Sequence, residues 1–129
     1  MKKILMLLCL SSLLMSHTCT DDDRYYYHDY PCTEEARAGL NVNVSLNGNP
    51  NVSADGITVT ARSGNYIEDL FPNIPDTPSF SGAYERAGNY IITVSKQGYE
   101  TFVSNPVRVE RDECHVIPRI ISVNLIPEN

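Results

Sequence analysis

The fold of this chain is decided by one stretch, Gly88-Asn89-Tyr90-Ile91-Ile92-Thr93-Val94-Ser95-Lys96-Gln97-Gly98-Tyr99. Apolar side chains occupy every second position at Tyr90, Ile92 and Val94, which is the period of a strand with one buried face. Gly88 lets the chain enter this strand, and Gly98 permits a positive φ in the tight turn that follows. We therefore expect Tyr90 to pack inward and Tyr99 to cover one end of the folded layers.

The same period of two recurs along the chain. It predicts strands over residues 38–46, 57–62, 66–67, 80–84, 90–95, 99–103, 107–109 and 120–126. Turn residues such as Asn47-Gly48-Asn49-Pro50 separate these strands. Three prolines between residues 71 and 79 exclude a central strand or a helix there, so we expect a loop. Seven or eight short strands with frequent turns indicate an all-β fold, an antiparallel β-sandwich.

Residues 88–99 resemble the hallmark strand and turn of carboxypeptidase regulatory-like domains, which are transthyretin-like (prealbumin-like) β-sandwiches. The family motif runs Gly-x-Tyr, an alternating strand and Gly-Tyr, and four residues match it: Gly88, Tyr90, Gly98 and Tyr99. The segment from Asn47 to Val59 is similar to the family's opening turn and second strand, so the resemblance covers roughly residues 38–126. The resemblance implies that the domain is an accessory module. It says little about function, because these domains occur in many different proteins.

The N-terminus has the layout of a secretory signal peptide. Lys2 and Lys3 precede an apolar run from Ile4 to Leu14, which is too short for the roughly 20 residues of a membrane-spanning helix. A buried N-terminal helix is the alternative, but no polar face alternates with the apolar one. We therefore expect residues 1–18 to be a cleaved leader that takes no part in the fold.

The residues after this run predict a lipid anchor. The stretch from Leu13 to Cys19 resembles a bacterial lipobox, whose cysteine is acylated, with palmitate for example, and becomes the first residue of the mature protein. His17 and Thr18 depart from the small residues that are usual before that cysteine. The resemblance implies a lipoprotein attached to a membrane through acyl chains at Cys19.

An acidic run follows the cysteine at once: Asp21, Asp22 and Asp23. A cysteine followed by such a run resembles the surface-export signal of lipoproteins in the Bacteroidetes lineage. It implies an outer-membrane lipoprotein exposed at the cell surface, with a periplasmic or secreted protein as the alternative. Residues 19–31, rich in Asp and Tyr and without periodicity, are then a tether to a domain at 32–129.

The cysteine count supports export. Cys9 leaves with the leader, so Cys19, Cys32 and Cys114 remain, an odd number for a compartment in which thiols pair. Acylation of Cys19 leaves Cys32 and Cys114 to form a disulfide, and ordinary cleavage after Cys19 would leave the same two. The competing hypothesis makes Cys114 and His115 metal ligands, although few other ligand residues are available to complete such a site.

Charge excludes one class of partner. Acidic residues outnumber basic ones 16 to 10, a net charge of -6, and loss of Lys2 and Lys3 with the leader makes the chain more acidic still. Such a chain is repelled by nucleic acid and by anionic lipid headgroups. We expect no nucleic-acid partner, and membrane attachment through acyl chains rather than through charge.

Catalytic motifs of enzymes with this fold do not match. Transthyretin-like hydroxyisourate hydrolases end in Tyr-Arg-Gly-Ser, whereas this chain ends Leu125-Ile126-Pro127-Glu128-Asn129. Intradiol dioxygenases hold iron with two Tyr and two His, and His28 and His115 are poorly placed for that. There is no Gly-x-Ser-x-Gly elbow.

The neighbouring carboxylates Glu68 and Asp69 are expected to be solvated edge charges that hinder edge pairing. We expect no enzyme activity, cofactor or metal.

The sequence thus predicts a non-catalytic, lipid-anchored β-sandwich of the cell envelope that binds an unknown protein or glycan at the surface. The alternative is a carrier for a small ligand, of transthyretin type, working as an oligomer. Gel filtration would separate the two, because a monomer could not form the channel between subunits that the carrier needs.

Overall fold

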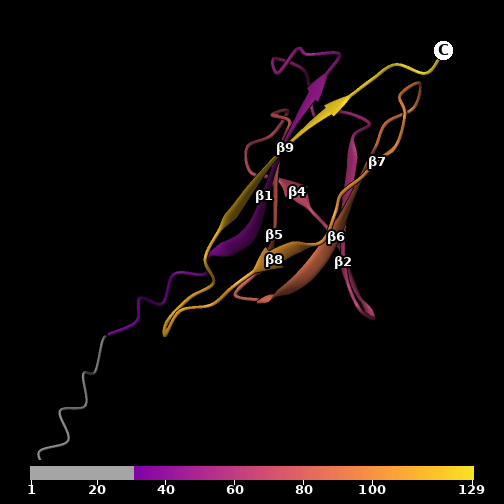
Figure 1. Ribbon diagram of the computed structural model, residues 1–129. Coiled ribbons are helices and arrows are strands. Elements are labelled where there is room, and N and C mark those ends of the chain that lie inside the picture. The colour runs from indigo at the N-terminus through magenta and orange to yellow at the C-terminus, as the bar shows by residue number, and fades with distance from the viewer. Residues whose placement is uncertain (1–30) are drawn as a thin grey trace, which may run out of the picture. The chain divides into compact units, whose positions relative to one another are not determined.

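The computed structural model of the chain describes residues 31–129 (Figure 1). These residues form nine strands: β1 (Ala38–Leu46), β2 (Thr58–Ser63), β3 (Tyr66–Asp69), β4 (Phe71–Pro72), β5 (Ser79–Tyr84), β6 (Gly88–Ser95), β7 (Phe102–Val103), β8 (Val107–Val109) and β9 (Arg119–Leu125). In this part of the chain no helix is long and apolar enough to span a membrane. Several predictions fall outside the described residues: the leader, Cys19, Asp21, Asp22, Asp23 and the tether up to Tyr30.

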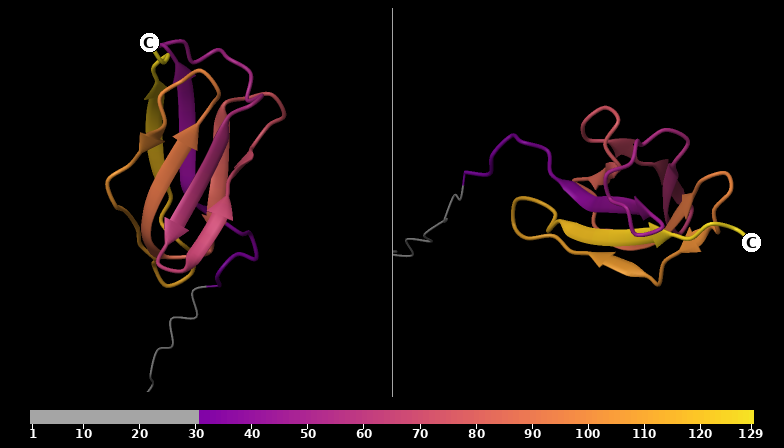
Figure 2. Two further views of the ribbon diagram at one scale, coloured as in Figure 1. Left: turned by 90° about the vertical axis from the view of Figure 1, so that its right-hand side faces the viewer. Right: turned by 90° about the horizontal axis from the view of Figure 1, so that it is seen from above.

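The strands form two sheets that pack as layers (Figure 2). One sheet has four strands in the order β4-β5-β1-β9. The other has five strands in the order β3-β2-β6-β7, with β8 also paired to β6. Apolar side chains from both sheets form a single core. This arrangement confirms the predicted all-β sandwich, and the two-residue strand β4 is the one strand beyond the eight predicted ranges.

One pair of strands departs from the predicted antiparallel arrangement. β1 and β9 run parallel, with Leu40 opposite Arg119 and Leu46 opposite Leu125. Antiparallel pairs can be joined by short hairpins, whereas a parallel pair needs a long connection. β1 and β9 are the first and last strands of the domain, so the whole intervening chain serves as that connection.

The predicted loop over residues 71–79 is wrong at its start. Phe71 and Pro72 form β4, which pairs with β5 at Phe71–Ser81 and Pro72–Phe80. Proline is tolerated there because β4 is an edge strand, and an edge strand has one side without ladder hydrogen bonds. The predicted return strand at 99–103 is also shorter, since only Phe102–Val103 pairs with β6.

The four motif residues of the 88–99 stretch lie much as expected. Tyr90 is fully buried in the core and its hydroxyl donates to the Arg86 carbonyl oxygen at 3.0 Å. Gly98 has a φ of +82°, and Tyr99 packs half-buried against the core. Gly88 is the first residue of β6, as predicted, and its position is tightly packed, because a Cβ there would lie 3.0 Å from Ser63 Oγ.

Candidate functional site

A disulfide joins Cys32, ahead of β1, to Cys114, ahead of β9. The two Cα atoms lie 5.2 Å apart and are separated by 82 residues in sequence. The pairing is the predicted one, and it corrects the competing hypothesis of a metal site at Cys114 and His115, because the Cys114 sulfur is bonded to Cys32. Within residues 31–129 no three His, Cys, Asp or Glu side chains are grouped closely enough to hold a metal ion.

His115 belongs to a buried polar contact beside this disulfide. Its Nδ1 lies 2.8 Å from Glu85 Oε1, and its Nε2 lies 3.0 Å from the hydroxyl of Thr33. Glu85 has a φ of +49° and exchanges two hydrogen bonds with Arg37, through its carboxylate at 2.8 Å and through its own N–H at 3.0 Å. These contacts and the disulfide fix the segment before β1 to the turn after β5 and the turn before β9.

The surroundings of two carboxylates lower their pKa values. The Arg37 backbone N–H has the largest effect on Glu85; burial opposes it, and the hydrogen bond with His115 adds to it. Asp112 Oδ1 accepts the backbone N–H groups of His115 and Cys114, and these bonds lower the pKa of Asp112. Each group therefore favours its ionised form in the native state.

We expect the fold to lose stability when both carboxylates are protonated. Their native pKa values are lowered, so their contribution is complete above the unfolded values near 4 and disappears as the pH falls through the lower native values. The urea concentration at the midpoint of unfolding should therefore decrease as the pH is lowered from about 5 to about 2. The isosteric variant Glu85→Gln with Asp112→Asn should show a smaller fall. If the urea midpoint decreased equally steeply with falling pH in the parent and in the variant, these two carboxylates would not be the source of the pH dependence.

The prediction that Glu68 is a solvated edge charge is wrong. Its two carboxylate oxygens accept a hydrogen bond from the Ala83 backbone N–H, at N···O distances of 3.1 and 3.0 Å. Glu68 Oε2 also accepts the Tyr66 hydroxyl at 2.9 Å. That last bond is the main reason why the pKa of Tyr66 is raised. Glu68 thus ties β3 in one sheet to β5 in the other. Asp69 is exposed, as predicted, and accepts the Thr60 hydroxyl at 2.9 Å.

The outer face of the four-stranded sheet is a candidate surface for binding. Because Leu40, Val42 and Val44 point into the core, the alternate residues of β1 and their partners in register point outward. We call these residues the Asn/Ser face: Asn41, Asn43, Ser45, Ser79, Ser122 and Asn124, with Phe71 and Ile120 at its two edges and the buried Ser81 beneath Phe71's end of it. None of these side chains is charged.

The two apolar ends of the Asn/Ser face are open to solvent. Phe71 is 72% exposed and Ile120 is 74% exposed. One row runs across the sheet from Phe71 through Ser81 and Asn41 to Ile120. Within it the Ser81 hydroxyl donates to Asn41 Oδ1 at 2.6 Å, which leaves the Asn41 NH₂ group to donate elsewhere. The alternating sequence pattern of residues 38–46 predicts that Asn41, Asn43 and Ser45 face away from the core. It does not identify the serines and the asparagine of the neighbouring strands, which the register adds.

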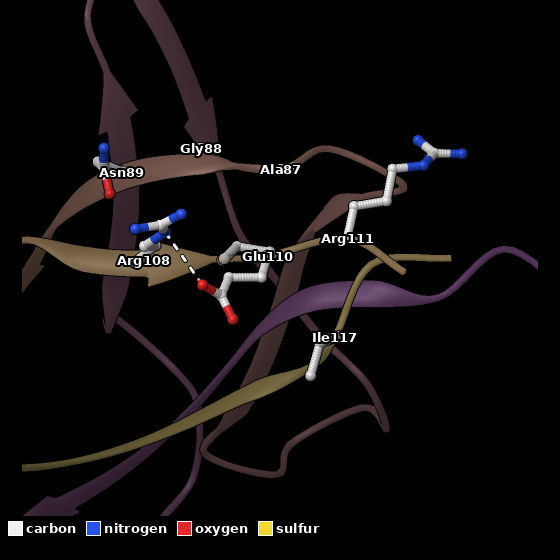
Figure 3. A pocket seen from close by; sticks show the side chains of 8 residues that line it. Ala87, Gly88, Asn89, Arg108, Glu110, Arg111 and Ile117 are labelled. Carbon is white, nitrogen blue, oxygen red and sulfur yellow. Dashed lines mark ion pairs between the residues drawn. The ribbon is translucent and has the colours of Figure 1, made fainter. Parts of the chain in front are cut away.

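A hollow of about 770 Å³ lies on the opposite sheet, where β6 meets β8 (Figure 3). Arg108, Val109, Glu110 and Arg111 line one side of it, and Ile117 lines another. Arg108 and Glu110 point toward each other as an exposed ion pair of 3.2 Å, while Arg111 extends away from them. The hollow lies next to the start of β9, because Ile117 lies two residues before Arg119, the first residue of that strand.

Comparison with known proteins identifies neither a family nor a function for these surfaces. No protein-family model and no curated protein matches the chain.

Proposed function

We propose that this chain is a non-catalytic, lipid-anchored module of the cell envelope whose Asn/Ser face binds a neutral carbohydrate. The observation that carries the proposal is the composition of that face: amide and hydroxyl groups without charge, beside the exposed ring of Phe71. The buried Tyr90 and the positive φ of Gly98 support a carboxypeptidase regulatory-like domain as its scaffold.

The chemistry of the Asn/Ser face favours a neutral sugar. Amides and hydroxyls both donate and accept hydrogen bonds, as sugar hydroxyls do, so each can exchange a bond with water for a bond with the ligand. An exposed aromatic ring offers an apolar platform for the C–H face of a sugar ring. Nucleic acid would require Lys and Arg on this face. Protein interfaces are depleted in Ser, which disfavours a protein ligand.

Affinity electrophoresis in gels that contain neutral glucans or mannans tests the proposal. The detergent-solubilised full-length protein should migrate more slowly in at least one of these polysaccharides. We expect Phe71→Ala or Asn43→Ala to weaken retention by about tenfold, equivalent to a loss of roughly 1.4 kcal/mol. The control Thr58→Ala, on an exposed position of the other sheet, should bind like the parent. Retention by anionic polysaccharide alone, or equal loss in the control, would contradict the proposal.

The anchor is tested by changing the predicted acylation site. We expect Cys19→Ala to prevent labelling with radioactive palmitate and to move the protein from the detergent phase to the aqueous phase, or to leave its precursor uncut. Replacing Asp21, Asp22 and Asp23 by alanine should keep the lipid but reduce cleavage by protease added to intact cells. Unchanged detergent partitioning of Cys19→Ala would reject the anchor, and unchanged cleavage of the triple variant would reject the export signal.

A further inference from the structure

The side-chain amide of Asn41 is held with its NH₂ group free. The Ser81 hydroxyl is buried and has no other acceptor among residues 31–129, so it donates its proton to Asn41 Oδ1 at 2.6 Å. The NH₂ group on the other side of the amide makes no hydrogen bond within the described residues, and it is not enclosed by the protein. A ligand on the Asn/Ser face can therefore reach this donor.

Asn124 is held in the same sense by different partners. Its Oδ1 accepts the Gly48 N–H at 2.7 Å and the Ser45 hydroxyl at 3.0 Å. Because a backbone N–H can only donate, the oxygen of this amide must face Gly48 and the NH₂ group must point elsewhere. Two asparagines of the face thus present donors, and a ligand has to supply the acceptors.

Apolar surface flanks the free donor of Asn41. Ile120 is the partner of Asn41 on β9 and is largely exposed. Neighbouring strands lie about 4.8 Å apart, so these two side chains stand next to each other. On the other side of Asn41, the exposed ring of Phe71 lies two strands away, beyond Ser81. A group that combines an acceptor oxygen with a methyl group would suit the place between Asn41 and Ile120.

The acetamido group of an N-acetylated sugar has this composition. Its carbonyl oxygen accepts hydrogen bonds and cannot donate them, and its methyl group is bonded to the same carbonyl carbon. When the oxygen accepts the Asn41 NH₂ group, the methyl group can pack against Ile120. A neighbouring sugar ring can then use Phe71 as its apolar platform. The hydroxyl that glucose carries at the same ring carbon brings no methyl group to Ile120.

We infer that the Asn/Ser face selects N-acetylated sugars, with Asn41 donating to the acetamido oxygen and Ile120 packing against the acetamido methyl group. This inference rests on the proposed carbohydrate binding and names the class of sugar. Glucans and mannans bind the same face more weakly, because their hydroxyls exchange hydrogen bonds with the amides but leave Ile120 in contact with water.

The test compares triacetylchitotriose with cellotriose, two trisaccharides that differ only in carrying an acetamido group or a hydroxyl on the second carbon of each ring. Each is titrated calorimetrically into the detergent-solubilised full-length protein. We expect triacetylchitotriose to bind at least tenfold more tightly, the combined effect of one hydrogen bond to an amide and one buried methyl group. In saturation-transfer NMR, its acetyl methyl protons should receive the strongest transfer from the protein.

Four variants assign the selectivity to its residues. Asn41→Asp keeps the shape and the acceptor for Ser81 but replaces the NH₂ donor by an oxygen, so the two affinities should become about equal. Ile120→Ser removes apolar surface at an exposed position and should lower the affinity ratio severalfold. Thr58→Asp adds a charge on the other sheet, and Asn124→Asp adds one elsewhere on the Asn/Ser face. Both should keep the parent's ratio.

The outcomes separate this inference from the proposal on which it rests. Equal affinities of the parent for the two trisaccharides, or a ratio that Asn41→Asp leaves intact, would overturn the selectivity and leave carbohydrate binding in place. Retention by a glucan or mannan gel without binding of triacetylchitotriose would do the same. Loss of the ratio in Thr58→Asp or Asn124→Asp would also overturn the selectivity, because added charge would then explain it. If neither trisaccharide binds and no neutral polysaccharide retains the protein, both proposals fail.

Discussion

Replacing Cys32 and Cys114 by serine should lower the free energy of unfolding by about 2–5 kcal/mol, the usual cost of losing a disulfide from a small secreted domain. The bond joins residues 82 positions apart, so it restricts the unfolded chain across almost the whole domain. A loss of this size is a large fraction of the 5–15 kcal/mol typical of a folded protein. We expect the urea midpoint to fall while the strand signal in circular dichroism at low temperature is retained.

Retention of the strands is expected because neither cysteine belongs to a strand or to the core. The matched control is the parent protein in reductant, which should unfold at the same urea concentration as the double serine variant. A thiol assay on the denatured parent without reductant provides an independent check. Two free thiols attributable to Cys32 and Cys114 would contradict the disulfide and return both residues to the set of possible ligands.

The core could be predicted from the sequence because it depends on a local pattern. Alternation in β1 and β6 places Leu40, Val42 and Val44 and then Tyr90 and Ile92 inside, and all five are buried. A strand's period of two fixes which face is buried without reference to its neighbours. It does not fix which strand lies alongside. The parallel pairing of β1 with β9 was therefore missed, and so were most members of the Asn/Ser face, which depends on that register.

The polar contacts were missed for a different reason. Ala83 and Glu85 have φ values of +53° and +49°, although neither is a residue type that marks a left-handed position. Tertiary hydrogen bonds hold them there, from the Ala83 N–H to Glu68 and between Glu85 and Arg37. The local sequence predicts a surface charge at Glu68 because it carries no sign of the partner, the Ala83 N–H, which lies 15 residues away on the other sheet.

Replacing Tyr90 by alanine should cost about 3–5 kcal/mol, the range for truncating a buried aromatic side chain. Tyr90 has no exposed surface and is the largest fully buried side chain in the described part of the chain, so its removal leaves a cavity between the sheets. Rigid strands on both sides limit collapse into that space. We expect the largest fall in urea midpoint among single changes in the 88–99 motif.

Two further variants separate the contributions of size, polarity and position. Tyr90→Phe keeps the ring but loses the bond to the Arg86 carbonyl, and should cost about 1 kcal/mol. Tyr99→Ala should cost less than Tyr90→Ala, because Tyr99 is only half-buried against the core. If Tyr99→Ala lowered the free energy of unfolding as much as Tyr90→Ala, the end of the sandwich would contribute as much to stability as its centre. Burial in the core would then not explain why a tyrosine occupies position 90 of the motif.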